Sequence, residues 1–124
     1  MLTITTETFS QVAAAAHWDE VEAALHGAQR YQLDHERYAS LERLGMLHIS
    51  AARGLAEDDH GATSDTSGAP LAGYAAFTLV ACPHRTQTML AALDGLYLAP
   101  EARGGLFALR LLRHAESALA VRGV

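Results

Sequence analysis

The sequence predicts an α+β fold in a single domain that spans residues 1–124. The first indication is the order of the expected elements, β-α-α-β-β-β-α, in which three strands follow one another between helical segments. The second is the composition. Half of the residues are hydrophobic, so a chain of this length can bury one core. Internal repeats are absent from the sequence.

Residues 2–9 alternate weakly and predict a short first strand. Ser10 is the expected N-cap of a helix from Gln11 to about His26. A break of this helix near residues 17–19 is an equally good interpretation. The apolar stripe of the helix would consist of Val12, Ala16, Val21 and Leu25.

A second helix is predicted from Asp34 to Leu44, and Gly45 is expected to end it. Its inward side chains would be Tyr38, Leu41 and Leu44. A strand should follow from Met46 to Ala52. Residues 54–70 are polar, acidic and rich in Gly, Ser and Thr, which predicts a flexible polar loop.

Two further strands are expected, from Leu71 to Ala81 and from Met89 to Leu98, separated at residues 82–85. The last element is an amphipathic helix from about Gly105 to Val121. Its apolar face would hold Phe107, Leu111, Leu112, Ala115, Ala118 and Leu119, and its polar face Arg110, Arg113, His114 and Ser117.

Composition and charge exclude several classes of protein. The single cysteine, Cys82, excludes an internal disulfide and fits a reducing compartment. No apolar run is long enough to span a membrane, and the first residues lack a signal-peptide pattern. We therefore expect a cytoplasmic protein without a membrane partner. The net charge of −5 argues against nucleic-acid binding. All nine basic residues are arginine, which suits bidentate contacts with phosphate or carboxylate.

The most informative segment is a strand, a short loop and a helix that follow one another without a spacer, at residues 93–112. Gly104 and Gly105 allow the backbone to approach a ligand closely, and the first helical turn offers unpaired N–H groups. Arg103 adds a cationic side chain that suits phosphate. A tight turn before a surface helix is an equally good interpretation of these residues alone. The spacing of a Rossmann motif and the Gly-Lys-Ser/Thr of a P-loop are both absent.

The segment from Leu93 to Val124 resembles the acetyl-CoA-binding core of the GNAT superfamily of N-acetyltransferases. In that family the fourth strand is followed by Arg/Gln-x-x-Gly-x-Gly/Ala. The corresponding residues here are 103–108, Arg-Gly-Gly-Leu-Phe-Ala, so Leu106 stands where glycine is usual. Residues 17–21, 83–84 and 94–101 extend the resemblance to small acetyltransferase-like proteins of phages and prophages, over nearly the whole chain.

The resemblance implies a GNAT-like mixed sheet with flanking helices, and acetyl-CoA as the co-substrate. Backbone groups of Leu96, Tyr97 and Leu98 would hold the pantetheine arm as an added strand. The pyrophosphate would lie against the residues of the family motif. These are Arg103, Gly104, Gly105, Leu106, Phe107 and Ala108.

Asp94 is the first candidate for a catalytic residue, as a base that deprotonates an amine or orders a water. Asp94 and Gly95 are also typical of a hairpin turn, but we favour a β-bulge within one long strand. His84 is a second candidate, as an acid or base near neutral pH, although a histidine beside a proline in a loop is more often a plain surface residue.

The acceptor side would be formed by His17, Trp18 and Glu20, and the equally good alternative is a core tryptophan flanked by solvated charges. We predict no metal site, because the histidines lack metal-ligand spacing. Cys82 is expected to be a packed small side chain rather than a nucleophile.

Relative to the family, the sequence ends after the third helix, so we expect the strand from Met89 to Leu98 to form an open sheet edge. Such an edge recruits other strands, which predicts a homodimer through this strand or dependence on a partner. The expected function is transfer of an acetyl group to an amine of a small molecule or a protein. The alternatives are a catalytically inactive GNAT-like accessory module of phage or prophage origin, and an unrelated α+β structural domain.

Overall fold

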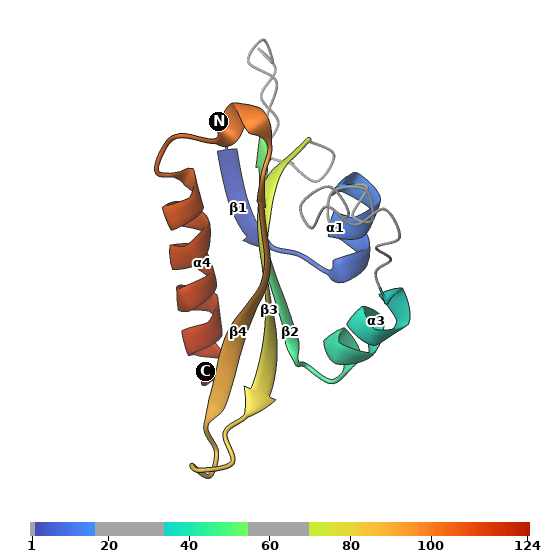
Figure 1. Ribbon diagram of the computed structural model, residues 1–124, viewed down its shortest axis with the longest axis vertical. Coiled ribbons are helices and arrows are strands. Elements are labelled where there is room, and N and C mark those ends of the chain that lie inside the picture. Colours follow the sequence, from blue (N-terminus) through green and yellow to red (C-terminus); the bar gives the residue numbers. More distant parts are fainter. Residues whose placement is uncertain (1, 17–33, 55–69) are drawn as a thin grey trace.

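The computed structural model describes residues 2–16, 34–54 and 70–124. Four strands form one antiparallel sheet in the order β1-β2-β3-β4. The helices pack on its two faces (Figure 1), which confirms the α+β class. The elements in chain order are β1 (Leu2–Thr6), α1 (Phe9–Ala16), α3 (His35–Arg43), β2 (Leu47–Gly54), β3 (Leu71–Ala81), β4 (Met89–Leu98), the 3₁₀ turn η1 (Pro100–Ala102) and α4 (Phe107–Val121).

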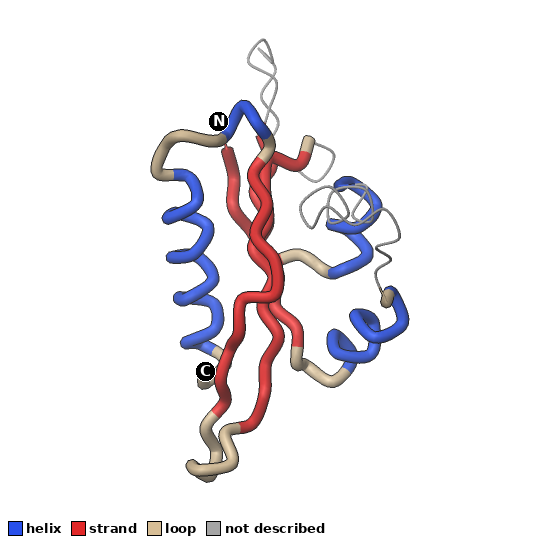
Figure 2. The backbone as a smooth tube through the Cα atoms, in the orientation of Figure 1, coloured by secondary structure: helices blue, strands red, loops and turns tan. Residues whose placement is uncertain are grey.

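The sheet lies between two helical layers, with α4 on one face and α1 and α3 on the other (Figure 2). Successive side chains of a strand point to opposite faces of the sheet. Since the first seven residues of β2 are all buried, β2 is covered on both faces. On the side of α1 and α3, the buried cluster consists of Phe9, Val12, Leu47, Ile49, Ala51, Tyr74 and Ala76. On the side of α4, it consists of Ala52, Ala75, Phe107 and Leu111.

Helix α1 begins two residues earlier than the sequence suggested, at Phe9, and its cap is Thr8 rather than Ser10. The hydroxyl of Thr8 accepts a hydrogen bond from the amide of Gln11 (3.3 Å), and the side-chain oxygen of Gln11 accepts one from the amide of Thr8 (2.8 Å). This reciprocal pair is a capping box. The prediction for Ser10 was wrong because Thr8 has a glutamine three residues after it, so the Thr8–Gln11 pair satisfies two backbone amides.

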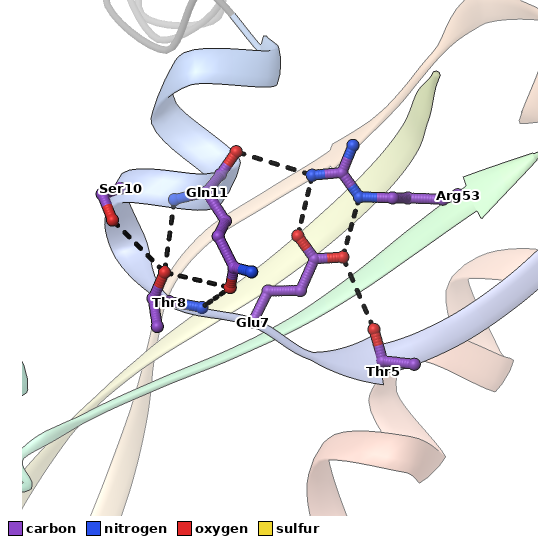
Figure 3. Close-up of polar contacts among 6 residues, drawn as sticks. All are labelled: Thr5, Glu7, Thr8, Ser10, Gln11 and Arg53. Carbon is purple, nitrogen blue, oxygen red and sulfur yellow. Dashed lines mark hydrogen bonds and ion pairs between the residues drawn. The ribbon is translucent and has the colours of Figure 1, made fainter. Parts of the chain in front are cut away.

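The link between β1 and α1 is fixed by a buried ion pair (Figure 3). The guanidinium of Arg53 on β2 donates from Nε and from a terminal nitrogen to the two carboxylate oxygens of Glu7, both at 2.8 Å. Both side chains are less than a tenth exposed. The hydrogen bond to Glu7 raises the pKa of Arg53, against the opposing effect of burial. A bidentate pair of this kind ties the start of α1 to the sheet.

The second predicted helix is confirmed as α3. The carboxylate of Asp34 accepts a hydrogen bond from the amide of Arg37 at 2.9 Å, so Asp34 is its N-cap. Gly45 follows the helix with a φ of +72°, a conformation that glycine adopts without strain. Leu44 was expected to point inward, but it is 71 % exposed, because it lies at the C-cap, where the helix turns away toward β2.

Helix α4 has the predicted apolar stripe, of which Phe107, Leu111, Ala115 and Leu119 are buried. One residue of its predicted polar face is different. His114 is half-buried and hydrogen-bonded to Ser50 of β2 at 2.7 Å. The helical pattern placed His114 with the solvated residues, because imidazole is polar. It packs inward because a buried hydroxyl on the sheet provides a partner.

Strand β1 ends at Thr6, so the predicted first strand over residues 2–9 was three residues too long, because Thr8 and Phe9 begin α1. Strands β3 and β4 have the predicted ends, and β2 runs from Leu47 to Gly54 instead of from Met46 to Ala52. The predicted flexible loop at 54–70 lies outside the described residues except for its two ends. These ends are joined by a hydrogen bond from the amide of Gly54 to the carbonyl of Pro70 at 3.1 Å.

Candidate functional site

Strand β4 contains a β-bulge at Asp94. Gly95 lies opposite Ala76 of β3 and Leu93 lies opposite Phe77, so Asp94 is the extra residue. The chain does not turn back at Asp94 and Gly95, which decides between the two interpretations of this dipeptide in favour of the bulge. Leu93 and Leu96 both lie on the α4 side of the sheet as a result, although they are three positions apart.

The far side of β4 is an open edge in the part of the chain that the structure describes, because β4 is the last strand of the sheet. The amide of Ala99 donates to the carbonyl of Ala72. Since hydrogen-bonded and non-hydrogen-bonded pairs alternate in an antiparallel ladder, the backbone groups of Leu96 and Leu98 point outward and those of Tyr97 point toward β3. Of the three residues expected to hold a pantetheine arm, two therefore offer backbone groups to a ligand along this edge.

The end of β4 is joined to the loop that follows it. Nε of Arg103 donates a hydrogen bond to the carbonyl oxygen of Leu98 at 2.8 Å. This contact holds the guanidinium beside the outward edge while its two terminal nitrogens remain for another acceptor. Gly73 of β3 lies close beneath, because a Cβ atom there would come within 2.6 Å of the carbonyl oxygen of Tyr97. Only glycine allows β3 to approach β4 this closely.

The loop between η1 and α4 is free of side-chain obstruction. A Cβ atom at Gly104 or Gly105 would meet no atom within 4 Å, and Gly104 has a φ of +90°. Leu106 is the N-cap of α4, makes no side-chain capping bond and is 75 % exposed. The first amides of α4, from Phe107 onward, are thus not capped by a side chain. An exposed loop before uncapped amides is suited to an anion.

Asp94 is contacted by a residue that the sequence did not single out as functional. The phenol of Tyr38 on α3 donates a hydrogen bond to Oδ2 of Asp94. The ring of Tyr38 is stacked on Phe9 of α1, with 4.9 Å between centroids and 4° between planes. The sequence placed Tyr38 in the core by its helical spacing, and the spacing gave no signal that its hydroxyl reaches β4.

A second polar cluster was also missed and lies under α4. The hydroxyl of Ser50 is within 2.8 Å of Nε2 of His48 and within 2.7 Å of Nδ1 of His114. Burial lowers the pKa of His48 to about 4, and the charges of Arg122 and His114 act in the same direction. His48 is therefore neutral at pH 7. The alternation of β2 contains the signal, since His48 and Ser50 share one face of a buried strand.

His84, the second candidate for a catalytic residue, does not lie near Asp94. His84 is exposed in the turn between β3 and β4, at the opposite end of the sheet from the loop before α4 (Figure 1). Asp94 is five positions along β4 from Met89, which lies next to this turn, a span of roughly 17 Å at 3.3 Å per residue. Cys82, two positions before His84 in the sequence, is half-buried. His17, Trp18 and Glu20 lie outside the described residues.

The described part of the chain contains neither a metal-ligand cluster nor a helix able to cross a membrane. No group of three or more His, Cys, Asp or Glu side chains is placed to hold a metal ion. None of the described helices has the length and hydropathy needed to cross a membrane. A shallow, open depression on α3 is lined by Asp34, Glu36, Arg37 and Ser40.

The fold is similar to that of solved acetyltransferases. One is an aminoglycoside acetyltransferase, meta-AAC0020, from an uncultured soil metagenomic sample in complex with sisomicin, with a TM-score of 0.68, 12 % identity, and coverage of 98 % of this chain and 72 % of that one. Another is AAC(6')-Iy in complex with a bisubstrate analog, CoA-S-monomethyl-acetylneamine, with a TM-score of 0.63, 13 % identity, and coverage of 99 % and 74 %.

A third similar structure is the ribosomal-protein-alanine N-acetyltransferase from Brucella melitensis biovar Abortus 2308, with a TM-score of 0.62, 17 % identity, and coverage of 98 % and 74 %. No protein-family model matches the sequence, and no curated protein matches it. At these identities the likeness establishes the architecture. The chain therefore has the fold of the GNAT N-acetyltransferases.

Proposed function

We propose that this protein is an acetyl-CoA-dependent N-acetyltransferase that acts on an amine. One observation carries the proposal. Within an acetyltransferase fold, the outward edge of β4 leads directly to the Arg103 side chain and to the uncapped amides of α4. An extended arm and an anionic group can thus be bound next to each other. Acetyl-CoA has these two parts side by side, as its pantetheine arm and its pyrophosphate.

The residues present fit this co-substrate. Leu96 and Leu98 would bind the pantetheine arm through outward backbone groups. Gly104, Gly105 and the first amides of α4 would bind the pyrophosphate, and the open space at both glycines leaves room for it. Leu106 is compatible with this arrangement, because its side chain extends into solvent and its φ of −84° does not require glycine.

Acetyl-CoA supplies an activated thioester, and the reaction forms a bond from the amine nitrogen to the carbonyl carbon while the carbon–sulfur bond breaks. The amine loses a proton and the departing thiolate gains one. In this chain the exposed carboxylate of Asp94 is the candidate acceptor for the amine proton. Backbone N–H groups on the outward edge of β4 are the candidates to stabilise negative charge on the carbonyl oxygen.

The acceptor class is a primary amine of a small molecule or a protein. Similar structures are described as acting on aminoglycosides and on the alanine of a ribosomal protein, and both carry amines. The net charge of −5 favours attraction of a cationic acceptor. The second candidate is an accessory module of phage or prophage origin without catalytic activity; leucine at position 106, although it leaves room for the co-substrate, departs from the glycine that is usual in the family motif.

Calorimetric titration with acetyl-CoA tests the binding site. We expect binding to the natural sequence, at least tenfold weaker binding to Arg103→Glu, and unchanged binding to Arg113→Glu, which makes the same charge change at an exposed position of α4. Equal loss in both variants would show a nonspecific charge effect. No detectable binding at millimolar acetyl-CoA would contradict the proposal.

Turnover distinguishes the enzyme from the accessory module. Release of the CoA thiol is followed by a thiol-reactive dye with sisomicin, spermidine and a peptide with N-terminal alanine as separate acceptors. Acetyl-CoA binding with thiol release that depends on one of these amines supports the enzyme. Binding without release in the presence of any of them favours the accessory module.

A further inference from the structure

Tyr38 and Asp94 are 56 positions apart in the sequence, and the fold brings them into contact. Tyr38 lies in the middle of α3, and Asp94 is the extra residue of the bulge in β4. The phenol oxygen donates to Oδ2 of the carboxylate. Asp94 is also the only charged residue among the ten of β4. A single carboxylate on an otherwise uncharged strand is thus met by one hydrogen-bond donor from the opposite layer.

The position of the phenol is determined by packing rather than by the contact with Asp94. The ring of Tyr38 is stacked on Phe9, which is 5 % exposed. The amide of Phe9 donates to Oε2 of Glu42 on α3 at 2.6 Å, so α1 and α3 are also joined by a polar contact. The hydroxyl is therefore presented at a fixed point by two helices, and little freedom is lost when it binds the carboxylate.

The contact leaves one carboxylate oxygen for other partners. Asp94 is exposed, and no described residue forms a hydrogen bond with its Oδ1. An exposed aspartate on its own samples several rotamers. Engagement of Oδ2 by a fixed donor selects the rotamer in which Oδ1 is presented to solvent, at the place where the outward edge of β4 passes the bulge.

We propose that Tyr38 is the positioning residue of Asp94, holding one carboxylate oxygen so that the other accepts the proton of the attacking amine. This inference rests on the function proposed above. Tyr38 acts through Asp94 and comes from α3, whereas the co-substrate is proposed to lie along the outward backbone edge of β4. Its loss thus affects turnover and leaves acetyl-CoA affinity unchanged.

The kinetic test compares Tyr38→Phe with Ser40→Ala, a control on the same helix whose hydroxyl is bonded to Arg43. Tyr38→Phe retains the ring and its stacking on Phe9. We expect kcat to fall about tenfold with the acetyl-CoA KM within twofold of the natural value, and Ser40→Ala to leave both unchanged. In an Asp94→Asn background, Tyr38→Phe should change kcat by less than twofold, since the two residues act as a unit.

A spectroscopic measurement reports the contact without turnover. With tyrosine labelled by carbon-13 at Cζ, Asp94→Ala should move the Tyr38 resonance, which is assigned from Tyr38→Phe, and leave the Tyr97 resonance in place. The inference is overturned if the chemical shift of the Tyr38 resonance is the same in Asp94→Ala as in the natural protein. An unchanged kcat in Tyr38→Phe also overturns it. The same holds if Tyr38→Phe lowers kcat by the same factor in the Asp94→Asn background as in the natural protein.

Failure of the proposed function gives a different result. In that case the natural protein neither binds acetyl-CoA nor releases CoA thiol, and the role of Tyr38 fails with it, even where the Tyr38 resonance responds to Asp94→Ala. Binding and turnover by the natural protein, together with an insensitive Tyr38→Phe variant, overturn the positioning role alone.

Discussion

Ser50 of β2 and His114 of α4 are joined by a hydrogen bond of 2.7 Å across the interface between the sheet and the helix. Ser50 is fully buried and also contacts Nε2 of His48, so a chain of three polar side chains crosses an otherwise apolar layer. Every member has a partner, which a buried polar group requires.

The cluster of His48, Ser50 and His114 predicts that the stability of the fold decreases at acidic pH. The pKa of His48 is lowered to about 4 by burial, whereas in the unfolded chain it is near 6.5. Between these values the unfolded state binds a proton that the folded state does not. The free energy of unfolding is therefore unaffected above pH 6.5 and falls progressively toward pH 4, by up to roughly 3 kcal/mol.

Urea denaturation at pH 7.5, 5.5 and 4.5 measures this dependence. The variant His48→Gln, which keeps a polar group at the position and removes the titration, should show a flatter curve over the same range. Parallel curves for the two proteins would assign the acid sensitivity to other groups.

The ion pair between Glu7 and Arg53 predicts a large loss of stability when one partner is removed. Glu7→Gln leaves a guanidinium with 8 % exposure without its carboxylate, and we expect a loss of about 3 kcal/mol in the free energy of unfolding. Arg37→Ala removes the exposed pair of Arg37 with Asp34 and should cost less than about 1 kcal/mol. Similar losses for both variants in urea denaturation would contradict this interpretation.

Two glycine-to-alanine changes should separate folding from ligand binding. Gly73→Ala places a Cβ atom 2.6 Å from the carbonyl oxygen of Tyr97, so β3 and β4 must move apart, and we expect a loss of at least about 2 kcal/mol in stability. Gly105→Ala meets no atom within 4 Å and should leave the thermal midpoint nearly unchanged. Calorimetry should then show weaker acetyl-CoA binding by Gly105→Ala, because the added methyl group occupies open space in which the pyrophosphate is proposed to lie.

Self-association through β4 remains a prediction of the open edge. Leu90 and Leu93 are about half exposed, and a strand with a single charge has little to prevent pairing with a second copy. We expect light scattering to give a rising mass at high micromolar concentration, and Leu90→Lys to reduce it. Val121→Lys at the exposed end of α4 serves as the control. A monodisperse monomer at these concentrations would count against the prediction.

The sequence was informative where local chemistry and periodicity act alone. The apolar stripe of α4 and the stop at Gly45 depend on neighbours within a few positions, and both are confirmed. The bulge was favoured for a local reason as well, since a turn at Asp94 would have left very short strands. The spacing of three positions between Leu93 and Leu96 also indicates a bulge. In a regular strand, residues three positions apart point to opposite faces, so one extra residue is needed to place both leucines on the same face.

The sequence by itself thus determined the fold class, the order of the elements and the strand–loop–helix segment that suggests an acetyl-CoA site. Only the tertiary structure decided which polar groups meet. Tyr38 with Asp94, His114 with Ser50 and Arg53 with Glu7 are separated by 56, 64 and 46 positions. Periodicity assigns a side chain to a face but carries no information about its partner across a layer. That pairing is decided by the packing of α1, α3 and α4 on the sheet, where each buried polar atom must be satisfied.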